Sequence, residues 1–165
     1  MGNNTFLYFG FASNMLEKRV RLSCPSAQRK GKGKLKGYKL DFNYRSERWK
    51  GAMATLTEDP NGVVWGAVWE IPISSRMELD RKEGVESGVY RVLEVKVDCD
   101  GEFLSCWAYQ CTRPFDQDRR PSPFYKSVIL EGARETFLPF DYVKMLESIE
   151  DNGYQGEVDW NLELS

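Results

Sequence analysis

Strand-forming segments joined by short turns occupy most of the chain between Thr5 and Thr112, and they constrain the fold more than any other feature. Glu58–Gly62 ends in Asn-Gly and Asp98–Glu102 contains Asp-Gly, and both pairs favour tight turns between antiparallel strands. We expect a hairpin at each turn, because connections this short leave no room for a crossover helix. The expected strands are Thr5–Phe9, Tyr38–Tyr44, Ala52–Thr57, Val63–Ile71, Val89–Val97 and Phe103–Thr112.

Two helices are expected between the strands of this part of the chain. Met15–Leu22 follows the first strand and is expected to form a short helix. Ser75 and Glu78 have the spacing of a capping box, which predicts a helix that ends at Glu83-Gly84.

Two further helices are expected in the last third of the chain. Ser122-Pro123 is an N-cap followed by proline at the first helical position, and Pro139 opens the last helix. Strands outnumber helices and connect mostly by hairpins, which predicts an α+β fold with a curved or barrel-like mixed β-sheet and helices packed outside. No linker or repeat divides the chain, so we expect a single domain over residues 1–165.

The only basic run of the chain has the period of a strand. Lys30, Lys32, Lys34 and Lys36 alternate with small or apolar residues, which predicts a strand with one charged face at the edge of the sheet. A nucleic-acid surface is the alternative, built on these lysines with nearby aromatics such as Trp49. The net charge of −2 does not attract nucleic acid or an acidic membrane, so we expect neither partner.

The residue types that are missing exclude several chemistries. The chain has no histidine, which rules out Ser-His and Cys-His nucleophile pairs and any His-ligated metal. Its four cysteines, Cys24, Cys99, Cys106 and Cys111, include no C-x-x-C pair, so neither a zinc site nor a disulfide framework is expected. The N-terminal residues are not a secretory signal, and we expect free thiols in a cytoplasmic protein.

The segment Tyr8–Met15 runs from a strand through small residues into the first expected helix. Such a junction leaves backbone N–H groups unpaired at the positive end of the helix, where they form an anion or oxyanion site. An ordinary tight connection is the alternative interpretation of this segment.

Glu83 falls at the C-terminal end of its expected helix, directly before Gly84. The helix dipole disfavours a carboxylate there and raises its pKa, which suits a group that both takes and gives a proton. A solvated surface glutamate, offset by Arg81 and Lys82, is the alternative. Backbone donors and one such carboxylate suffice for an intramolecular acyl transfer in which the substrate supplies its own nucleophile.

Both segments, together with others in the same order, resemble the gamma-glutamylcyclotransferase family. The resemblance extends from about Tyr8 to Val158. The segments that carry it are Tyr8–Asn14, Pro25–Ala27, Leu40–Phe42, Val64–Trp69, Leu79–Tyr90 and Pro121–Lys126.

The resemblance implies an enzyme that converts gamma-glutamyl amino acids to 5-oxoproline and a free amino acid, with no metal or cofactor, and a homodimer. Glu83 matches the acid/base glutamate of the family, and Tyr125 matches a tyrosine that contacts substrate. Tyr90 and Tyr109 are expected near them. The substrate-binding loop of the family corresponds to Tyr8, Phe9, Gly10, Phe11, Ala12 and Ser13.

The loop departs from the family pattern at two positions. The family has Tyr-Gly-Ser-Asn where this chain has Phe11-Ala12-Ser13-Asn14, so a hydroxyl is lost at position 11. If position 12 needs a positive φ, alanine costs about 1–2 kcal/mol there. A non-catalytic relative that binds a small molecule or a protein is therefore the alternative function.

Overall fold

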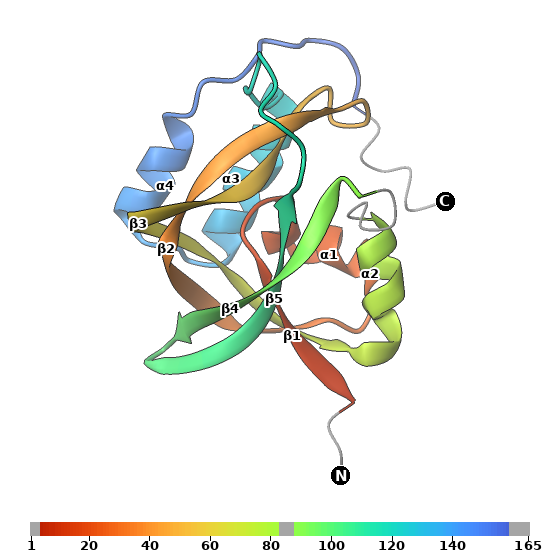
Figure 1. The fold of residues 1–165 in the computed structure, drawn as a ribbon, viewed down its shortest axis with the longest axis vertical. Coiled ribbons are helices and arrows are strands. Elements are labelled where there is room, and N and C mark those ends of the chain that lie inside the picture. The colour runs from red at the N-terminus through yellow and green to blue at the C-terminus, as the bar shows by residue number, and fades with distance from the viewer. Residues whose placement is uncertain (1–3, 83–87, 159–165) are drawn as a thin grey trace.

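The β-sheet closes into a barrel in the order β1-β3-β2-β4-β5. The structure is a computed structural model that describes residues 4–82 and 88–158 (Figure 1). β1 and β5 pair in parallel at Tyr8 and Trp107, while the other neighbours are antiparallel, so the sheet is mixed. The expected barrel-like mixed sheet is confirmed. The strands are β1 Thr5–Gly10, β2 Gln28–Ser46, β3 Gly51–Pro72, β4 Tyr90–Cys99 and β5 Glu102–Cys111.

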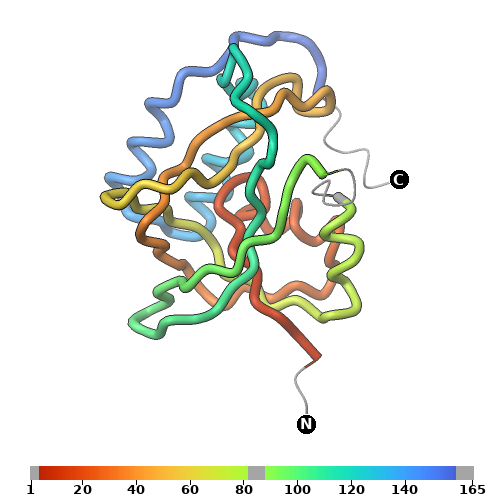
Figure 2. The backbone as a smooth tube through the Cα atoms, viewed as in Figure 1, coloured from red at the N-terminus to blue at the C-terminus, as the bar shows by residue number. Residues whose placement is uncertain are grey.

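The helices lie outside this barrel, as expected, in two groups. α3 and α4 lie together on one side of the barrel, and α1 and α2 lie on the other (Figures 1 and 2). The α-helices are α1 Glu17–Ser23, α2 Arg76–Lys82, α3 Pro123–Glu135 and α4 Phe140–Glu147, and two short 3-10 helices are η1 Ser13–Met15 and η2 Ile73–Ser75.

The prediction of a hairpin at Glu58–Gly62 is wrong. The residues on both sides of this segment pair with the same neighbour, β2, because Glu58 lies opposite Tyr38 and Val63 lies opposite Lys36. The segment is therefore an irregularity within one long strand. The Asp59 carboxylate accepts a hydrogen bond from the Asn61 amide at 3.0 Å, so the turn residues form a local turn without reversing the chain.

The reversal between β2 and β3 lies instead at residues 47–50, which the sequence pattern had not marked. The Lys50 amide donates to the Ser46 carbonyl at 2.8 Å, and Lys50 has a φ of 62°. The other expected hairpin, between β4 and β5, is confirmed. Asp100 and Gly101 have φ values of 55° and 88°, as a two-residue turn of the hairpin type requires.

The lysine-rich segment lies within β2, and its expected position at a sheet edge is wrong. β2 pairs with β3 on one side and meets β4 at Lys34 and Asp98 on the other. The alternation itself is confirmed, since Lys30 and Lys36 are exposed while Leu35 is buried. Barrel closure thus places the inner face of this strand in the core and leaves the charged face outside.

Two helix starts differ from expectation. Met15–Leu22 is not one helix, because extended Leu16, with ψ of 125°, separates η1 from α1. Ser75 is not an N-cap, because it lies in η2, which leads directly into α2. The expected end of that helix at Glu83-Gly84 lies outside the residues that the structure describes.

The two later helix starts agree with the sequence. The Ser122 hydroxyl accepts the Tyr125 amide at 3.1 Å, and Pro123 is the first residue of α3. Pro139 stands directly before α4. Local capping chemistry therefore sets where α3 begins.

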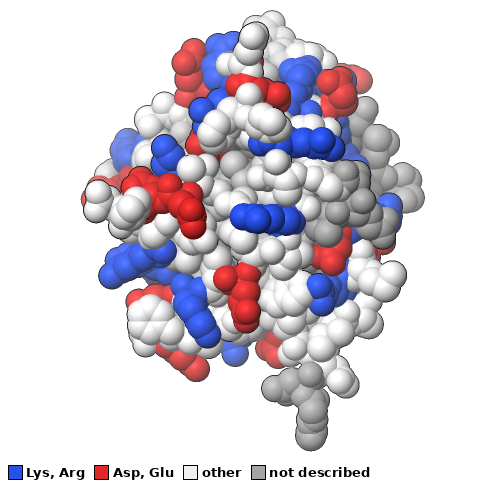
Figure 3. Space-filling model, in the orientation of Figure 1, with Lys and Arg blue, Asp and Glu red and all other residues white. Residues whose placement is uncertain are grey.

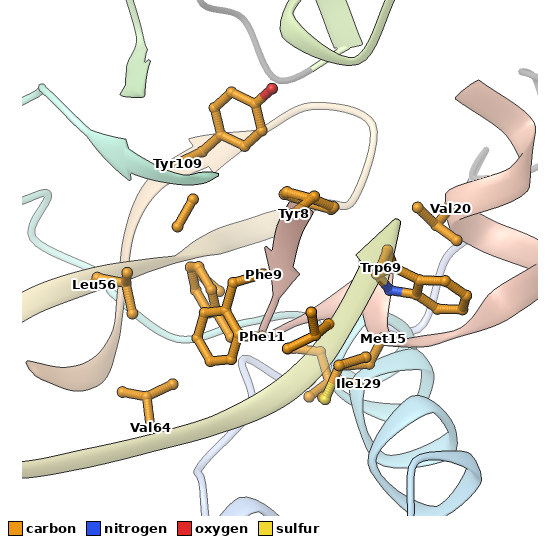
Figure 4. Packing of buried hydrophobic residues seen from close by; sticks show 14 of the residues in the cluster. Tyr8, Phe9, Phe11, Met15, Val20, Leu56, Val64, Trp69, Tyr109 and Ile129 are labelled. Carbon is orange, nitrogen blue, oxygen red and sulfur yellow. The ribbon is translucent and has the colours of Figure 1, made fainter. Parts of the chain in front are cut away.

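The core fills the barrel and continues into its contact with α3 (Figure 4). Phe9 and Phe11 pack with ring centroids 6.1 Å apart, and Met15 lies beside Ile129 of α3. A Cβ built on Gly132 would lie 2.8 Å from the Leu16 amide nitrogen and equally close to the Met15 Cβ. Glycine at 132 therefore allows α3 to approach the backbone that follows β1.

We expect Gly132→Ala to destabilise the protein by about 1–3 kcal/mol, because overpacking against a backbone atom outweighs the gain of about 1 kcal/mol in helix propensity. Urea denaturation measures the change. Glu131→Ala, at the exposed neighbouring position of α3, is the matched control and should alter stability by less than about 0.5 kcal/mol. A stabilised Gly132→Ala protein would contradict the close approach.

All four cysteines lie within the described residues and are free thiols, as expected. Burial raises the pKa of Cys24 to about 11 and that of Cys106 to about 12. Both thiols are therefore neutral and poorly nucleophilic at physiological pH.

These raised pKa values predict a loss of stability in alkali. Above the usual thiol pKa of 9.0 the unfolded thiols ionise while the folded ones stay protonated, so their contribution is complete below that pH and declines toward about pH 11. The free energy of unfolding in urea should fall more between about pH 8 and pH 10 for the wild type than for a Cys24→Ala, Cys106→Ala double variant. Equal losses of stability in the two proteins would refute the raised pKa values of Cys24 and Cys106.

Candidate active site

A cavity of about 190 Å³ lies where the segment after β1 meets the β2–β3 turn. It contains five of the residues that the sequence placed in the substrate site, together with Tyr90 and Tyr109. Segments far apart in the chain thus converge on one cavity. Its lining residues are Tyr8, Phe11, Ala12, Ser13, Asn14, Arg19, Ser46, Arg48, Trp49, Met53, Ala54, Tyr90, Tyr109 and Tyr125.

Phe9 and Gly10 belong to the expected loop but do not line the cavity. Successive side chains in a strand point to opposite faces, so Tyr8 faces the cavity while Phe9 is fully buried in the barrel. A Cβ on Gly10 would lie 2.7 Å from the Asn14 carbonyl oxygen. These two residues therefore set the path of the loop, and their neighbours form the wall.

The four consecutive residues Phe11–Asn14 all line the cavity. The Ala12 and Ser13 amides donate to no acceptor elsewhere in residues 4–82 and 88–158. The Asn14 carbonyl accepts the Trp69 indole N–H at 2.8 Å, which holds the end of the segment. Two adjacent N–H groups of this segment thus have no acceptor within the described residues, and the expected anion site there stays a prediction.

Ala12 does not have the positive φ that would penalise alanine. Its φ is −135° and its ψ is −124°, so the conditional cost of a positive φ at position 12 does not apply. Phe11 is 7% exposed and packs against Phe9, so its ring serves the core as well as the cavity. Both departures from the family pattern are accommodated without left-handed backbone.

Two tyrosine hydroxyls are fixed on the backbone of one residue of β3. The Ala54 amide donates to the Tyr125 hydroxyl at 3.0 Å, and the Tyr90 hydroxyl donates to the Ala54 carbonyl at 3.0 Å. The Tyr125 hydroxyl is thus an acceptor and the Tyr90 hydroxyl a donor in these two bonds, which hold both rings against the same residue of the cavity wall.

Another pair of tyrosines connects the cavity to its surroundings. The rings of Tyr8 and Tyr109 lie 5.7 Å apart (Figure 4). The Asn14 side-chain amide donates to the Tyr8 hydroxyl at 2.9 Å, and the Tyr109 hydroxyl donates to the Asp80 carboxylate of α2. The described part of α2 therefore contacts a residue of the cavity wall.

Glu83, the expected acid/base residue, is outside the described residues. It follows Lys82, the last residue of α2 that the structure describes. Its expected role therefore stays a prediction.

Sequence reasoning missed the residues that α1 and the β2–β3 turn contribute. Trp49 is 2% exposed, with its ring 4.7 Å from that of Tyr125 and 5.3 Å from the Arg19 guanidinium carbon. Trp49 and Phe42, two of the aromatics near the lysine-rich segment, are buried, which argues against a nucleic-acid surface built on them. A tryptophan within a charged turn was the one signal that pointed to this corner.

The charges on the molecular surface do not gather into one patch on the face shown in Figure 3, where acidic and basic side chains are interspersed. Residues 4–82 and 88–158 include no group of three or more Cys, Asp or Glu side chains arranged to hold a metal ion. None of their helices is long and apolar enough to cross a bilayer.

Comparison with known proteins identifies the family. Residues 63–146 match the sequence model of the AIG2-like family. The chain is 43% identical over 164 residues to bovine gamma-glutamylcyclotransferase, an alignment that covers 96% of this chain and 86% of the bovine protein. The chain belongs to the gamma-glutamylcyclotransferase family.

Solved structures share this fold along nearly the whole chain. A structure named gamma-glutamyl cyclotransferase is 40% identical, superposes with a TM-score of 0.90 and is covered over 94% of either chain. A human protein described as uncharacterized is also 40% identical, with a TM-score of 0.91 and 95% coverage of each chain.

The bond between Ala54 and Tyr125 predicts a stability effect. Tyr125→Phe should destabilise the protein by about 1–3 kcal/mol, because it leaves the buried Ala54 amide without its acceptor. Thermal and urea unfolding measure the loss. Tyr38→Phe is the control, since the Tyr38 hydroxyl bonds to no other described residue, and a loss as large in Tyr38→Phe would argue against the bond.

Proposed function

We propose that this chain, a gamma-glutamylcyclotransferase, converts gamma-glutamyl amino acids to 5-oxoproline and a free amino acid in the cavity beside the Tyr8–Asn14 segment. The observation that supports the proposal is that Ala12 and Ser13, whose amides donate to no acceptor within the described residues, line a cavity together with four tyrosines. Amides held in this way bind a carboxylate or a tetrahedral oxyanion without rearrangement.

The proposed substrate site divides its roles among the residues of the wall. The Ala12 and Ser13 amides receive an anionic group of the substrate, while Tyr8 and Phe11 supply the surface against which its aliphatic chain packs. Phe9 and Gly10 support this loop from behind and act by positioning it. Tyr125 donates a hydrogen bond to the substrate from its place on the Ala54 amide.

Ring closure needs a proton acceptor first and a proton donor afterwards. Glu83 removes a proton from the α-ammonium, and the amine nitrogen then attacks the γ-carbonyl carbon to close a five-membered ring. The tetrahedral oxyanion collapses as the bond to the departing nitrogen breaks, and Glu83 returns its proton to that nitrogen. The ring nitrogen then gives up its second proton through the same carboxylate to the released amine, which leaves as an ammonium while the ring becomes a neutral lactam. Atoms and charge balance without a covalent enzyme intermediate.

The cavity contributes chiefly by holding the substrate folded. Nucleophile and electrophile belong to one molecule, so the entropic advantage of an intramolecular reaction is realised only when the chain is held in its ring-closing shape. An enclosed wall of aromatic rings and oriented donors favours that shape over the extended forms that dominate in water.

We further propose that the protein is cytoplasmic, as expected from its free thiols, and a homodimer, as the family resemblance implies; both stay predictions. Sedimentation of the purified protein tests the oligomeric state. A non-catalytic binding role is the alternative to turnover, and the experiment below separates the two.

Purified protein given gamma-glutamyl-L-alanine should release 5-oxoproline and alanine with no added metal or cofactor. Glu83→Gln should lower kcat by at least about 10²–10⁴-fold, because the amide keeps the size of the side chain and cannot take up a proton. Chromatographic measurement of 5-oxoproline follows the reaction.

Glu94→Gln, on an exposed part of β4, is the matched control and should keep full activity. Normal turnover by Glu83→Gln would remove Glu83 from the mechanism. Absence of turnover in the wild type with every gamma-glutamyl substrate would favour the non-catalytic role.

A further inference from the structure

Asp80 of α2 has no part in the proposed reaction, although it contacts the wall of the cavity. The Tyr109 hydroxyl donates a hydrogen bond to the Asp80 carboxylate, and Tyr109 is buried and lines the cavity. Figure 4 shows the Tyr109 ring beside Tyr8, with its hydroxyl directed away from the buried Phe9. Asp80 itself does not line the cavity. The bond therefore joins a helix outside the barrel to a residue of the cavity wall.

The helix and the strand meet at two matched positions. The Arg76 guanidinium carbon lies 3.4 Å from the centre of the Trp107 ring, and the Arg76 Nε lies 3.6 Å from the Asp80 carboxylate. Arg76 and Asp80 are four residues apart, which places them on one face of α2 about 6 Å apart along its axis. Trp107 and Tyr109 share one face of β5 and are separated by about 7 Å. The two spacings agree, so both contacts form together.

The last turn of α2 is also held by an apolar contact. Leu79, directly before Asp80, is 1% exposed and belongs to the core, whereas Met77 on the same helix is 80% exposed. The described helix has seven residues, which is too short to be stable without tertiary contacts. The position of α2 therefore depends on what its inner face binds, and Asp80 makes the hydrogen bond that reaches the cavity wall.

We propose that Asp80 is a positioning residue for the proposed cyclisation: its hydrogen bond with Tyr109 fixes the cavity wall and the last turn of α2 relative to each other. This inference rests on the proposed function. Glu83, the proposed acid/base residue, follows this turn along the chain, so a shift of α2 changes how the proton acceptor approaches the substrate. Asp80 acts through Tyr109 and touches neither the substrate nor the reacting atoms.

The first test separates kcat from KM with gamma-glutamyl-L-alanine as substrate. Asp80→Ala should lower kcat by about 10- to 100-fold, because a displacement of about 1 Å is enough to cost about 10²-fold in rate. Its KM should change by less than about 3-fold, because Asp80 does not line the cavity. Asp80→Asn should restore most of kcat, since the side-chain amide oxygen still accepts the Tyr109 hydroxyl. Circular dichroism checks that each variant is folded at the assay temperature.

A double-mutant cycle tests whether Asp80 acts through Tyr109. Tyr109→Phe removes the same hydrogen bond from its other end and should also lower kcat. The double variant should be no slower than the slower single variant, because residues that act through one contact are not additive. Losses that multiply in the double variant would overturn the proposal. Full kcat in Tyr109→Phe would overturn it as well, even if Asp80→Ala failed to fold.

Met77→Ala is the matched control, because Met77 lies on the same helix and is exposed. It should leave kcat and KM unchanged, and a loss of kcat equal to that of Asp80→Ala would contradict a specific role for Asp80. Normal kcat in Asp80→Ala beside an active wild type would refute the positioning role and leave the proposed cyclisation intact. A wild type that cyclises no gamma-glutamyl substrate would instead refute the proposed function.

Discussion

The segment after β1 depends on three close approaches that leave no room for a Cβ atom. A Cβ on Gly10 would meet the Asn14 carbonyl at 2.7 Å, one on Gly66 would meet the Gly10 carbonyl at 2.5 Å, and one on Gly132 would meet the Leu16 amide at 2.8 Å. These contacts hold the segment between the barrel and α3. Because the contacting atoms are mostly backbone, the segment has little room to move.

This constraint explains how two amides remain available to a ligand. The segment neither continues β1 nor begins an α-helix at once, so the Ala12 and Ser13 amides enter no ladder and no helical turn. A mobile loop would pay conformational entropy to bring both donors to one anion. In this segment that entropy is lost on folding, before any ligand binds, which is consistent with the proposed anion site.

The remainder of the cavity follows from barrel closure. Parallel pairing of β1 with β5 places Tyr8 beside Tyr109, and the long β3 strand brings Ala54 under Tyr90 and Tyr125. The hydroxyls are oriented by backbone groups, whose positions are set by the sheet. Such support keeps the donors and acceptors of the wall in place when the cavity is empty.

Sequence reasoning succeeded where the governing interaction was local. The Asp100-Gly101 turn and the Ser122 cap were predictable because left-handed backbone and side-chain capping are properties of a few adjacent residues. It failed at Glu58–Gly62, where the same turn chemistry exists but pairing of both flanks with β2 overrides it. A pattern cannot report which neighbour a strand has.

The residues of the candidate site also fall into those that local sequence motifs reveal and those that only the tertiary structure reveals. Tyr8, Phe11, Ala12, Ser13 and Tyr125 were recognisable because they lie in segments that resemble a known family. Arg19, Arg48 and Trp49 were not, because their approach to the cavity arises only when α1 and the β2–β3 turn pack against the barrel.

The amino-acid sequence by itself determined the family, the barrel-like mixed sheet and the segment that lines the cavity, since these depend on local periodicity and ordered motifs. Only the tertiary structure decided the length of β2 and β3, the orientation of Phe9 into the core and the pair of arginines at the cavity. The physical reason is that strand pairing and side-chain burial are long-range interactions, which have no fixed spacing along the chain.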